Sequence, residues 1–360
     1  MTVATATSPS RNLRAREVLA AWGRILAGSP PMLSIEITKE CPLSCPGCYA
    51  YNEQHLGGAA NLRDLSDFRG EELVRRVVDL VKRHRPMHVS LVGGEPLVRR
   101  RELDQILPQL SQLEVFTLVV TSAVAPIPAA WMEIPRLRVT VSVDGLPEHH
   151  DIRRKPATYE RILKNIAGRE VNIHLTVTRP MVHRAGYLEE YFAFWSARPE
   201  INHIWVSTYT PQVGEQTCEM LTRSDRAALF ERMPDWRRAF PKLLMTQDMV
   251  GAFAQPPQKP ADCVFSKMSV NYSADLNTRV EPCILGGVPD CSQCGCAASV
   301  GFHSLRHTGL LGPLKVGHLI GASVAIGATV GRVRRSIEPQ RWRKPAPPSG
   351  KAGLVQLRVP

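Results

Sequence analysis

The sequence predicts an α/β protein, a partial parallel (β/α)6 barrel followed by a small cysteine-rich hairpin domain. Strand-like and helix-like stretches alternate from residue 32 to residue 211, as they do where parallel strands are joined by right-handed crossovers. Turns rich in cysteine, glycine and aspartate follow the ends of predicted strands, where parallel barrels gather their functional residues. Five further cysteines lie around a hairpin-like segment after residue 262.

Six short stretches with the apolar pattern of strands predict the barrel sheet. They span residues 32–38, 87–96, 114–123, 137–145, 171–178 and 201–211. Apolar residues at helical spacing predict helices at 71–84, 102–113, 158–168 and 187–197. Pro108 is expected to interrupt or end the second of these helices. The helix after the first strand starts late, which leaves a long loop for three cysteines.

Five segments are expected along the chain. A barrel at residues 32–215 follows an N-terminal segment (1–31) and precedes a helical connector (216–262), a cysteine region (263–300) and a basic tail (301–360). The net charge of +12 belongs to the ends, because residues 32–300 hold 31 Lys and Arg against 31 Asp and Glu. Such a tail is either solvated or in contact with an anionic surface.

Within the tail, residues 316–331 contain no Asp, Glu, Lys or Arg, and Val316, Leu319, Ile320 and Val324 share one helical face. The stretch is short for a membrane span, so it is expected either to cap the barrel or to lie on a membrane surface beside a basic anchor. The first 31 residues lack the pattern of a secretory signal. A cytoplasmic protein is therefore expected. The alternative is a cytoplasmic protein that contacts the membrane peripherally through its tail.

Eight of the nine cysteines fall into two groups, and only Cys218 stands alone. The first cysteine set, Cys41, Cys45 and Cys48, lies within eight residues directly after the first predicted strand. Clustered cysteines in a reducing compartment more often bind metal than form disulfides. Three thiolates suit either a zinc ion with an open position or three irons of a [4Fe–4S] cube whose fourth iron lacks a protein ligand.

The C-x3-C-x2-C spacing after a first barrel strand resembles the radical S-adenosylmethionine (SAM) superfamily. "VGGEP" at 92–96, "TSA" at 121–123 and "SVDGLPEHHDIRR" at 142–154 match the later strand-end motifs of that family in the same order. The resemblance covers residues 32–211. It implies that the fourth iron is chelated by SAM, whose reductive cleavage gives a 5′-deoxyadenosyl radical that abstracts hydrogen from a substrate.

The resemblance also implies which residues contact SAM. Gly93, Gly94 and Glu95 would face its amino group, Ser142 and Asp144 would lie near the ribose or the substrate, and Arg154 would lie near its carboxylate. One position departs from the family, where the residue before the third cysteine is usually aromatic and packs near adenine. Here it is Gly47, so Tyr49 or Tyr51 would supply an aromatic wall, or both pack under the loop.

The second cysteine set comprises Cys263, Cys283, Cys291, Cys294 and Cys296. Residues 264–282 between its first two members read as a β-hairpin. This arrangement resembles the twitch and SPASM extensions that follow many radical SAM barrels, and it implies one further [4Fe–4S] cluster. The implied ligands are Cys263, Cys283, Cys291 and Cys294, with Cys296 as a substitute for one of the last two; a zinc knuckle is the alternative.

The expected cofactors are therefore two [4Fe–4S] clusters and SAM. The expected partner is a reductant such as a flavodoxin or ferredoxin. A fully ligated second cluster would transfer electrons.

A peptide is the expected substrate. The short N-terminal segment leaves little room for a leader-peptide domain, so a small metabolite or a lipid head group is the alternative substrate. A non-catalytic iron–sulfur carrier or a structural zinc protein would need neither Glu95 nor Arg154. No nucleic-acid-binding pattern is present.

Overall fold

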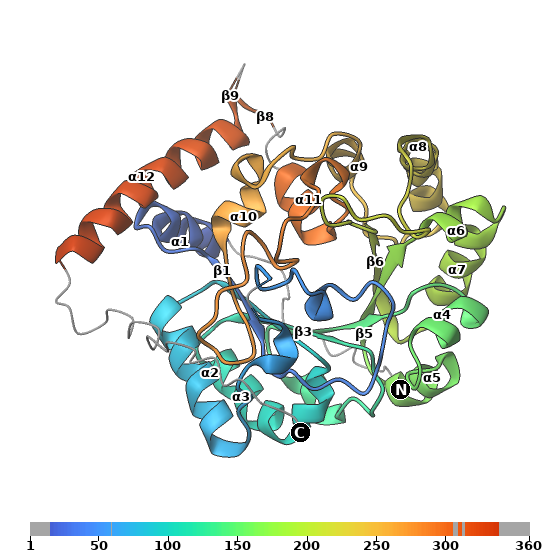
Figure 1. Ribbon diagram of the computed structural model, residues 1–360, viewed down its shortest axis with the longest axis horizontal. Helices are drawn as coiled ribbons and strands as arrows, with labels where there is room; N and C mark the ends of the chain where they lie inside the picture. The colour runs from blue at the N-terminus through green and yellow to red at the C-terminus, as the bar shows by residue number, and fades with distance from the viewer. Residues whose placement is uncertain (1–14, 59, 305–308, 312–313, 338–360) are drawn as a thin grey trace, which may run out of the picture.

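The computed structural model describes residues 15–58, 60–304, 309–311 and 314–337. Its centre is a seven-stranded parallel sheet in the order β6-β5-β4-β3-β2-β1-β7 (Figure 1). The strands are β1 (Met32–Glu36), β2 (His88–Val92), β3 (Phe116–Thr121), β4 (Leu137–Ser142), β5 (Val171–Val177), β6 (Ile201–Thr208) and β7 (Ser269–Tyr272). The α/β class and the six predicted strands are confirmed, with the architecture of a partial barrel.

Helices flank the sheet and separate its strands. They are α1 (Ala15–Leu26), α2 (Gly70–His84), α3 (Arg100–Gln112), α4 (Pro147–Arg153), α5 (Tyr159–Ile166), α6 (Arg179–His183), α7 (Tyr187–Ser196), α8 (Arg223–Ala239), α9 (Gln247–Ala254), α10 (Val264–Met268), α11 (Ala297–Ser304) and α12 (Val316–Ile337). A small separate pair is formed by β8 (Gly309–Leu311) and β9 (Leu314–Lys315). Helix α2 shows why these segments fold: its apolar residues are buried, and acidic and basic residues occupy its first and last turns, which suits the helix dipole.

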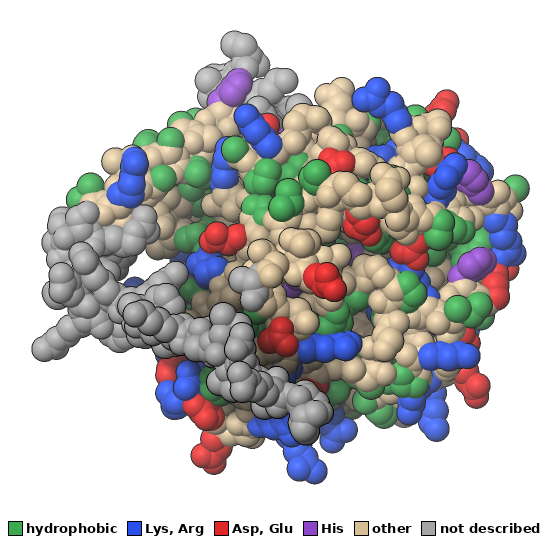
Figure 2. All heavy atoms as spheres, viewed as in Figure 1, with side chains coloured by type: hydrophobic (Ala, Val, Ile, Leu, Met, Phe, Trp, Pro, Cys, Tyr) green, Lys and Arg blue, Asp and Glu red, His purple; other side chains and the backbone are tan. Residues whose placement is uncertain are grey.

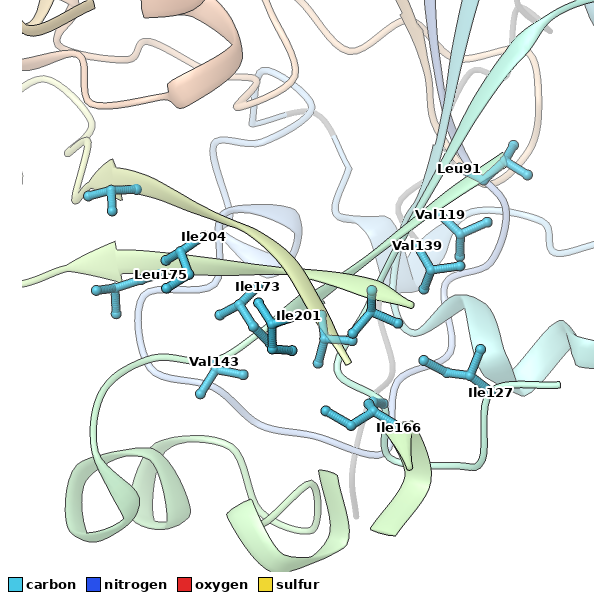
Figure 3. Close-up of a cluster of buried hydrophobic side chains, with 14 of the residues drawn as sticks. Leu91, Val119, Ile127, Val139, Val143, Ile166, Ile173, Leu175, Ile201 and Ile204 are labelled. Atoms are coloured by element: carbon cyan, nitrogen blue, oxygen red, sulfur yellow. The ribbon is translucent and has the colours of Figure 1, made fainter. Parts of the chain in front are cut away.

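The main core lies between the sheet and these helices. Leu91, Val119, Val139, Ile173 and Ile204 come from five successive strands, β2 to β6, and meet in one buried cluster (Figure 3). Strands of a parallel sheet are covered on both faces, so they are rich in branched apolar residues. On the face seen in Figure 2, acidic and basic side chains are interspersed over the surface, in keeping with a barrel region of balanced charge.

The prediction for Pro108 was wrong, because α3 continues through this residue to Gln112. A proline inside a helix removes one hydrogen bond and costs about 3 kcal/mol. The buried face of α3, which includes Leu103, Ile106, Leu107 and Leu110, packs into the main core. Burial of these four side chains outweighs the local cost of the proline.

The cysteine-rich region does not form the separate hairpin that the sequence predicts. Its first strand, β7, pairs in parallel with β1 and becomes the edge strand of the main sheet. The chain then turns back, and Tyr272 and Arg279 form an antiparallel bridge that is flanked by backbone hydrogen bonds from Ser273 N to Thr278 O and from Val280 N to Asn271 O. Part of the predicted hairpin segment, residues 264–282, therefore does turn back on itself. The pairing of its first strand depends on an exposed edge of β1 that local sequence does not reveal.

Helix α12 lies alongside α1 on the outer side of the molecule (Figure 1). Ile320 packs with Ile25 of α1 and with Val264 and Met268 of α10, and Val316 and Val324 border this cluster. A Cβ atom at Gly327 would lie 1.9 Å from Ile25 O, so the two helices approach at a glycine. By length and composition alone, Val316–Val333 could also cross a membrane, with 22% of that stretch buried.

Candidate active site

The first cysteine loop, residues 37–58, leaves the carboxyl end of β1 and is held by the turn that follows β2. The amide of Gly94 donates to Thr38 O at 2.9 Å. The amide of Glu95 donates to Glu40 O at 2.8 Å. A Cβ atom added at Gly94 would lie 2.1 Å from Glu40 O, and one added at Gly93 would lie 2.8 Å from Thr38 O. The two glycines are therefore needed where the chain packs on its own backbone, a reason other than the ligand approach inferred from the sequence.

The three thiols of the first cysteine set lie within electrostatic reach of one another. Burial is the main cause that raises the pKa of Cys41 to about 11, and Glu95, Cys45 and Cys48 raise it further. Burial also raises the pKa of Cys45, and Cys48 adds to the effect. Such thiols persist as thiolates only where a cation neutralises them. The donor set therefore fits a bound metal cluster.

Glu95 joins the ends of β2 and β3. Its carboxylate accepts hydrogen bonds from the Leu97 amide (2.9 Å), the Thr121 hydroxyl, and the amide and hydroxyl of Ser122 (2.7 and 2.6 Å). These four donors take up the acceptor positions of a carboxylate, and the side chain is buried. The Thr-Ser-Ala turn thus serves to anchor Glu95. The contact with the SAM amino group implied by the resemblance would require one of these hydrogen bonds to be exchanged.

Asp144 and Arg154 form an ion pair beside the cysteine loop. Arg154 Nε donates to Asp144 Oδ2 at 2.8 Å. Burial alone would raise the pKa of Asp144, but the charges of Arg154 and Arg153 outweigh it and hold the pKa well below its usual range. Asp144 Oδ1 is buried without a hydrogen-bond partner among the described residues. Arg154 is also within electrostatic reach of Cys45 and Cys48, so its positive group faces the region where a SAM carboxylate is expected. Ser142 ends β4 and is almost fully buried.

Arg153 is a site residue that sequence reasoning missed. Its guanidinium donates to Asp144 Oδ2 at 3.1 Å and to Pro46 O at 2.9 Å, and it forms an ion pair with Glu219. It therefore ties the first cysteine loop to β4 and to the connector that follows β6. The sequence offered no specific signal for this role, because Pro46 and Glu219 lie far from Arg153 along the chain.

The aromatic residues around Gly47 also differ from the expectation. A Cβ atom at Gly47 would lie 3.0 Å from the ring of Tyr209, which directly follows β6. Tyr209 therefore occupies the space beside this glycine. Tyr49 packs against His55, with ring centroids 5.7 Å apart, and the Tyr51 hydroxyl donates to a backbone carbonyl of the same loop at 2.8 Å. Both loop tyrosines thus pack under the loop, as the second of the two sequence interpretations expects.

All five cysteines of the second set line one pocket. Its remaining walls are largely apolar and include Phe265, Ile284 and Leu285. Burial raises the pKa of Cys291 to about 11 and that of Cys296 to about 12, and neighbouring thiols contribute in each case. Burial also raises the pKa of Cys283, with further contributions from Cys296, Cys294 and Cys263. The pocket therefore gathers five thiols whose ionised forms would need a cation to neutralise them.

Two glycines fix this pocket over the barrel. A Cβ atom at Gly295, between Cys294 and Cys296, would lie 2.0 Å from Thr208 Oγ1 at the end of β6. A Cβ atom at Gly286 would lie 2.0 Å from His55 O in the first cysteine loop. The second cysteine set is thus clamped between β6 and the first cysteine loop, and Tyr49 is within electrostatic reach of Cys48 from one set and Cys296 from the other.

Neither set has the close convergence of a zinc site. In the part of the chain that the structure describes, no three His, Cys, Asp or Glu side chains are placed to hold one metal ion. With Zn–S distances of about 2.3 Å, a tetrahedral zinc would bring its sulfurs to within about 4 Å of one another. A [4Fe–4S] cube takes each thiolate on a different iron, so its ligands stand farther apart.

Comparison with known proteins identifies the domain that carries the first cysteine set. Residues 35–190 match the sequence profile of the Radical SAM superfamily. These residues form a radical SAM domain. Within it lie the first cysteine set and all the residues that the sequence assigned to SAM.

Known proteins that resemble this chain include a peptide cyclase and a protein bound to a precursor peptide. The PqqA peptide cyclase of Rhodopseudomonas palustris (strain ATCC BAA-98 / CGA009) is 32% identical over 97 residues, which is 27% of this chain and 23% of that protein. The crystal structure of Streptococcus suis SuiB bound to precursor peptide SuiA has a TM-score of 0.51 at 18% identity, covering 75% of this chain and 63% of SuiB. Native anSMEcpe with bound AdoMet has a TM-score of 0.50 at 13% identity, covering 85% and 98%. These likenesses to solved structures show a shared fold, and the matches span less than two thirds of the cyclase and of SuiB.

Proposed function

We propose that this chain is an enzyme that cleaves SAM reductively and uses the resulting radical to abstract hydrogen from a peptide. The observation that carries the proposal is the meeting of Cys41, Cys45 and Cys48 with Arg154 at the carboxyl ends of the strands of a radical SAM domain. Three thiolates would hold a [4Fe–4S] cluster, which, when bound, supplies the electron for SAM cleavage. A flavodoxin or ferredoxin would be the reductant.

The chain's own residues have distinct tasks in this proposal. Arg154 would bind the SAM carboxylate, and Asp144 orients Arg154 through the hydrogen bond to Nε, because a fixed guanidinium loses less freedom on binding. Glu95 links the ends of β2 and β3 through its hydrogen bonds. Arg153 holds the cysteine loop at Pro46 O. Tyr209 stands beside Gly47, where an aromatic face could border an adenine ring.

The second cysteine set is proposed to hold a further [4Fe–4S] cluster with an electron-transfer role. Its proposed ligands are Cys263, Cys283, Cys291 and Cys294, because C-x2-C is a usual cluster spacing. Cys296 lines the same pocket and is the alternative ligand. Four protein ligands leave no open iron, so this cluster would exchange electrons and not bind the substrate.

A peptide is proposed as the substrate because the similar proteins include a peptide cyclase and a protein bound to a precursor peptide. The test is an anaerobic incubation of reconstituted protein with SAM, dithionite and short peptides encoded beside its gene, followed by mass spectrometry. We expect 5′-deoxyadenosine from every preparation that holds the first cluster, and a loss of hydrogen from one peptide. Formation of 5′-deoxyadenosine that is stimulated only by a small metabolite or lipid head group would reject the peptide and keep the SAM chemistry.

A further inference from the structure

Arg226, in the first turn of α8, lies against the second cysteine set. Its guanidinium donates to the backbone carbonyls of Cys294 and Gln293, both at 3.1 Å. It also donates to the Thr208 hydroxyl at 2.9 Å and to Phe253 O at 3.0 Å. All four acceptors are neutral oxygens, so the hydrogen bonds satisfy the donors of the guanidinium but do not neutralise its charge.

Among the described residues, no carboxylate forms an ion pair with Arg226. The carboxylate that acts on its charge is that of Asp290. Its carboxylate already accepts hydrogen bonds from the amide and hydroxyl of Ser292 (3.1 and 2.6 Å) and from Gln293 Nε2 (2.8 Å). A partly buried cation without an anionic partner is unfavourable, and burial lowers the pKa of Arg226. The strongest anionic influence on it comes from the Cys294 thiol when ionised.

We propose that Arg226 is the charge partner of the cluster held by the second cysteine set, and that it raises the reduction potential of this cluster. The inference rests on the proposed second cluster. A cube ligated by four thiolates is an anion and gains another negative charge on reduction. A fixed neighbouring cation stabilises the reduced form more than the oxidised form, and net charge and hydrogen bonding are what set cluster potentials. In this one-electron reduction, the added reductant supplies the electron and the cluster accepts it.

The test is a redox titration followed by electron paramagnetic resonance (EPR) in the full-length chain that carries Cys41→Ala, Cys45→Ala and Cys48→Ala, so that only the second cluster contributes. Arg226→Met removes the charge, and Arg226→Lys retains it without the planar fork. Arg238→Met is the matched control, because Arg238 is an exposed residue of the same helix that pairs with Asp235. We expect a more negative midpoint potential in Arg226→Met, and values close to the parent in Arg226→Lys and Arg238→Met.

Equal potentials in Arg226→Met and Arg238→Met, with iron retained in both, would overturn the inference. If Arg226→Met loses its iron, the lysine variant decides the case. If Arg226→Lys retains its iron and unfolds at the same midpoint as Arg226→Met, the result supports a role for the positive charge at residue 226 in balancing the charge of the cluster. Loss of iron in both would mean that Arg226 acts only by holding the carbonyls of Gln293 and Cys294, which contradicts the proposal. If the triple Cys→Ala chain with native Arg226 binds no iron, the proposed second cluster itself is rejected. That result is distinct from a failure of the inference about Arg226.

Discussion

His55 Nε2 lies 2.7 Å from Glu36 Oε1, and both side chains are shielded from solvent. Three segments meet at this pair, because His55 belongs to the first cysteine loop, Glu36 ends β1, and His55 Nδ1 contacts Leu285 O at 3.0 Å, just after Cys283. Ser273 also donates to Glu36 at 2.6 Å. Burial alone would lower the pKa of His55, but the hydrogen bond and charge of Glu36 outweigh it and raise this pKa.

Breaking this pair should destabilise the fold and loosen both cysteine sites. His55→Gln leaves the buried Glu36 carboxylate without its charged partner, which typically costs about 3–5 kcal/mol. The free energy of unfolding is measured by urea denaturation of the unloaded chain. His183→Gln is the control, because His183 makes a similar pair with Asp225 at 2.8 Å but is largely exposed, and it should change stability by less than about 1 kcal/mol. Equal effects from His55→Gln and His183→Gln would argue against a structural role for the buried pair.

Two alanine substitutions should separate the cysteine sites. Gly94→Ala places a methyl group 2.1 Å from Glu40 O, and Gly295→Ala places one 2.0 Å from Thr208 Oγ1. The first should reduce iron binding by the first cysteine set, and the second should reduce it in the second set, because each moves the loop that carries the ligands. Gly251→Ala in α9 meets no atom within 4 Å and should leave both sites loaded. Iron analysis with EPR of each cluster distinguishes the cases, and normal loading of Gly94→Ala and Gly295→Ala would count against the packing described.

Two single variants can identify which cysteine completes the ligand set of the proposed second cluster. We expect Cys291→Ala to lose the second-set iron and Cys296→Ala to keep it, since Cys291 and Cys294 have the usual C-x2-C spacing. Both residues line the same pocket, so each variant makes a similar local change. The opposite result, with iron lost only from Cys296→Ala, would replace Cys291 by Cys296 in the proposed ligand set.

Helix α12 is expected to act as a structural cap. A chain that ends at Leu314 removes the contacts of Ile320, Val316 and Val324 with α1 and α10, which should lower the free energy of unfolding by about 3 kcal/mol. Co-sedimentation with anionic and neutral vesicles tests the membrane alternative. Equal recovery of both chains in the supernatant, with the shorter chain less stable, is the expected result. Binding to anionic vesicles that disappears on truncation would instead place the helix on a membrane surface.

The sequence was sufficient for the strands, the first cysteine loop and the grouping of the second cysteine set, because these depend on local periodicity and spacing. It did not predict that β7 would join β1, since strand pairing depends on which sheet edge is free. It also did not identify Arg226, Arg153 or the partner of His55, because each contacts residues far away along the chain. The role of Glu95 was only partly predictable: the motif located the carboxylate, but its four hydrogen-bond donors become apparent only when β2 and β3 lie together.

The central claim, that one cysteine set leaves an iron open for SAM and the other does not, is tested most directly by EPR of reduced protein with and without SAM. Wild-type protein should hold about eight irons per chain if both sites carry cubes of four. Cys283→Ala should retain the first cluster, whose spectrum should change when SAM is added. The triple variant, which carries Cys41→Ala, Cys45→Ala and Cys48→Ala, should retain the second cluster. The EPR spectrum of this cluster should not change when SAM is added. Three results would contradict this claim. They are an EPR spectrum of the triple variant that changes when SAM is added, an EPR spectrum of iron-loaded Cys283→Ala that does not change, and stoichiometric zinc in place of iron.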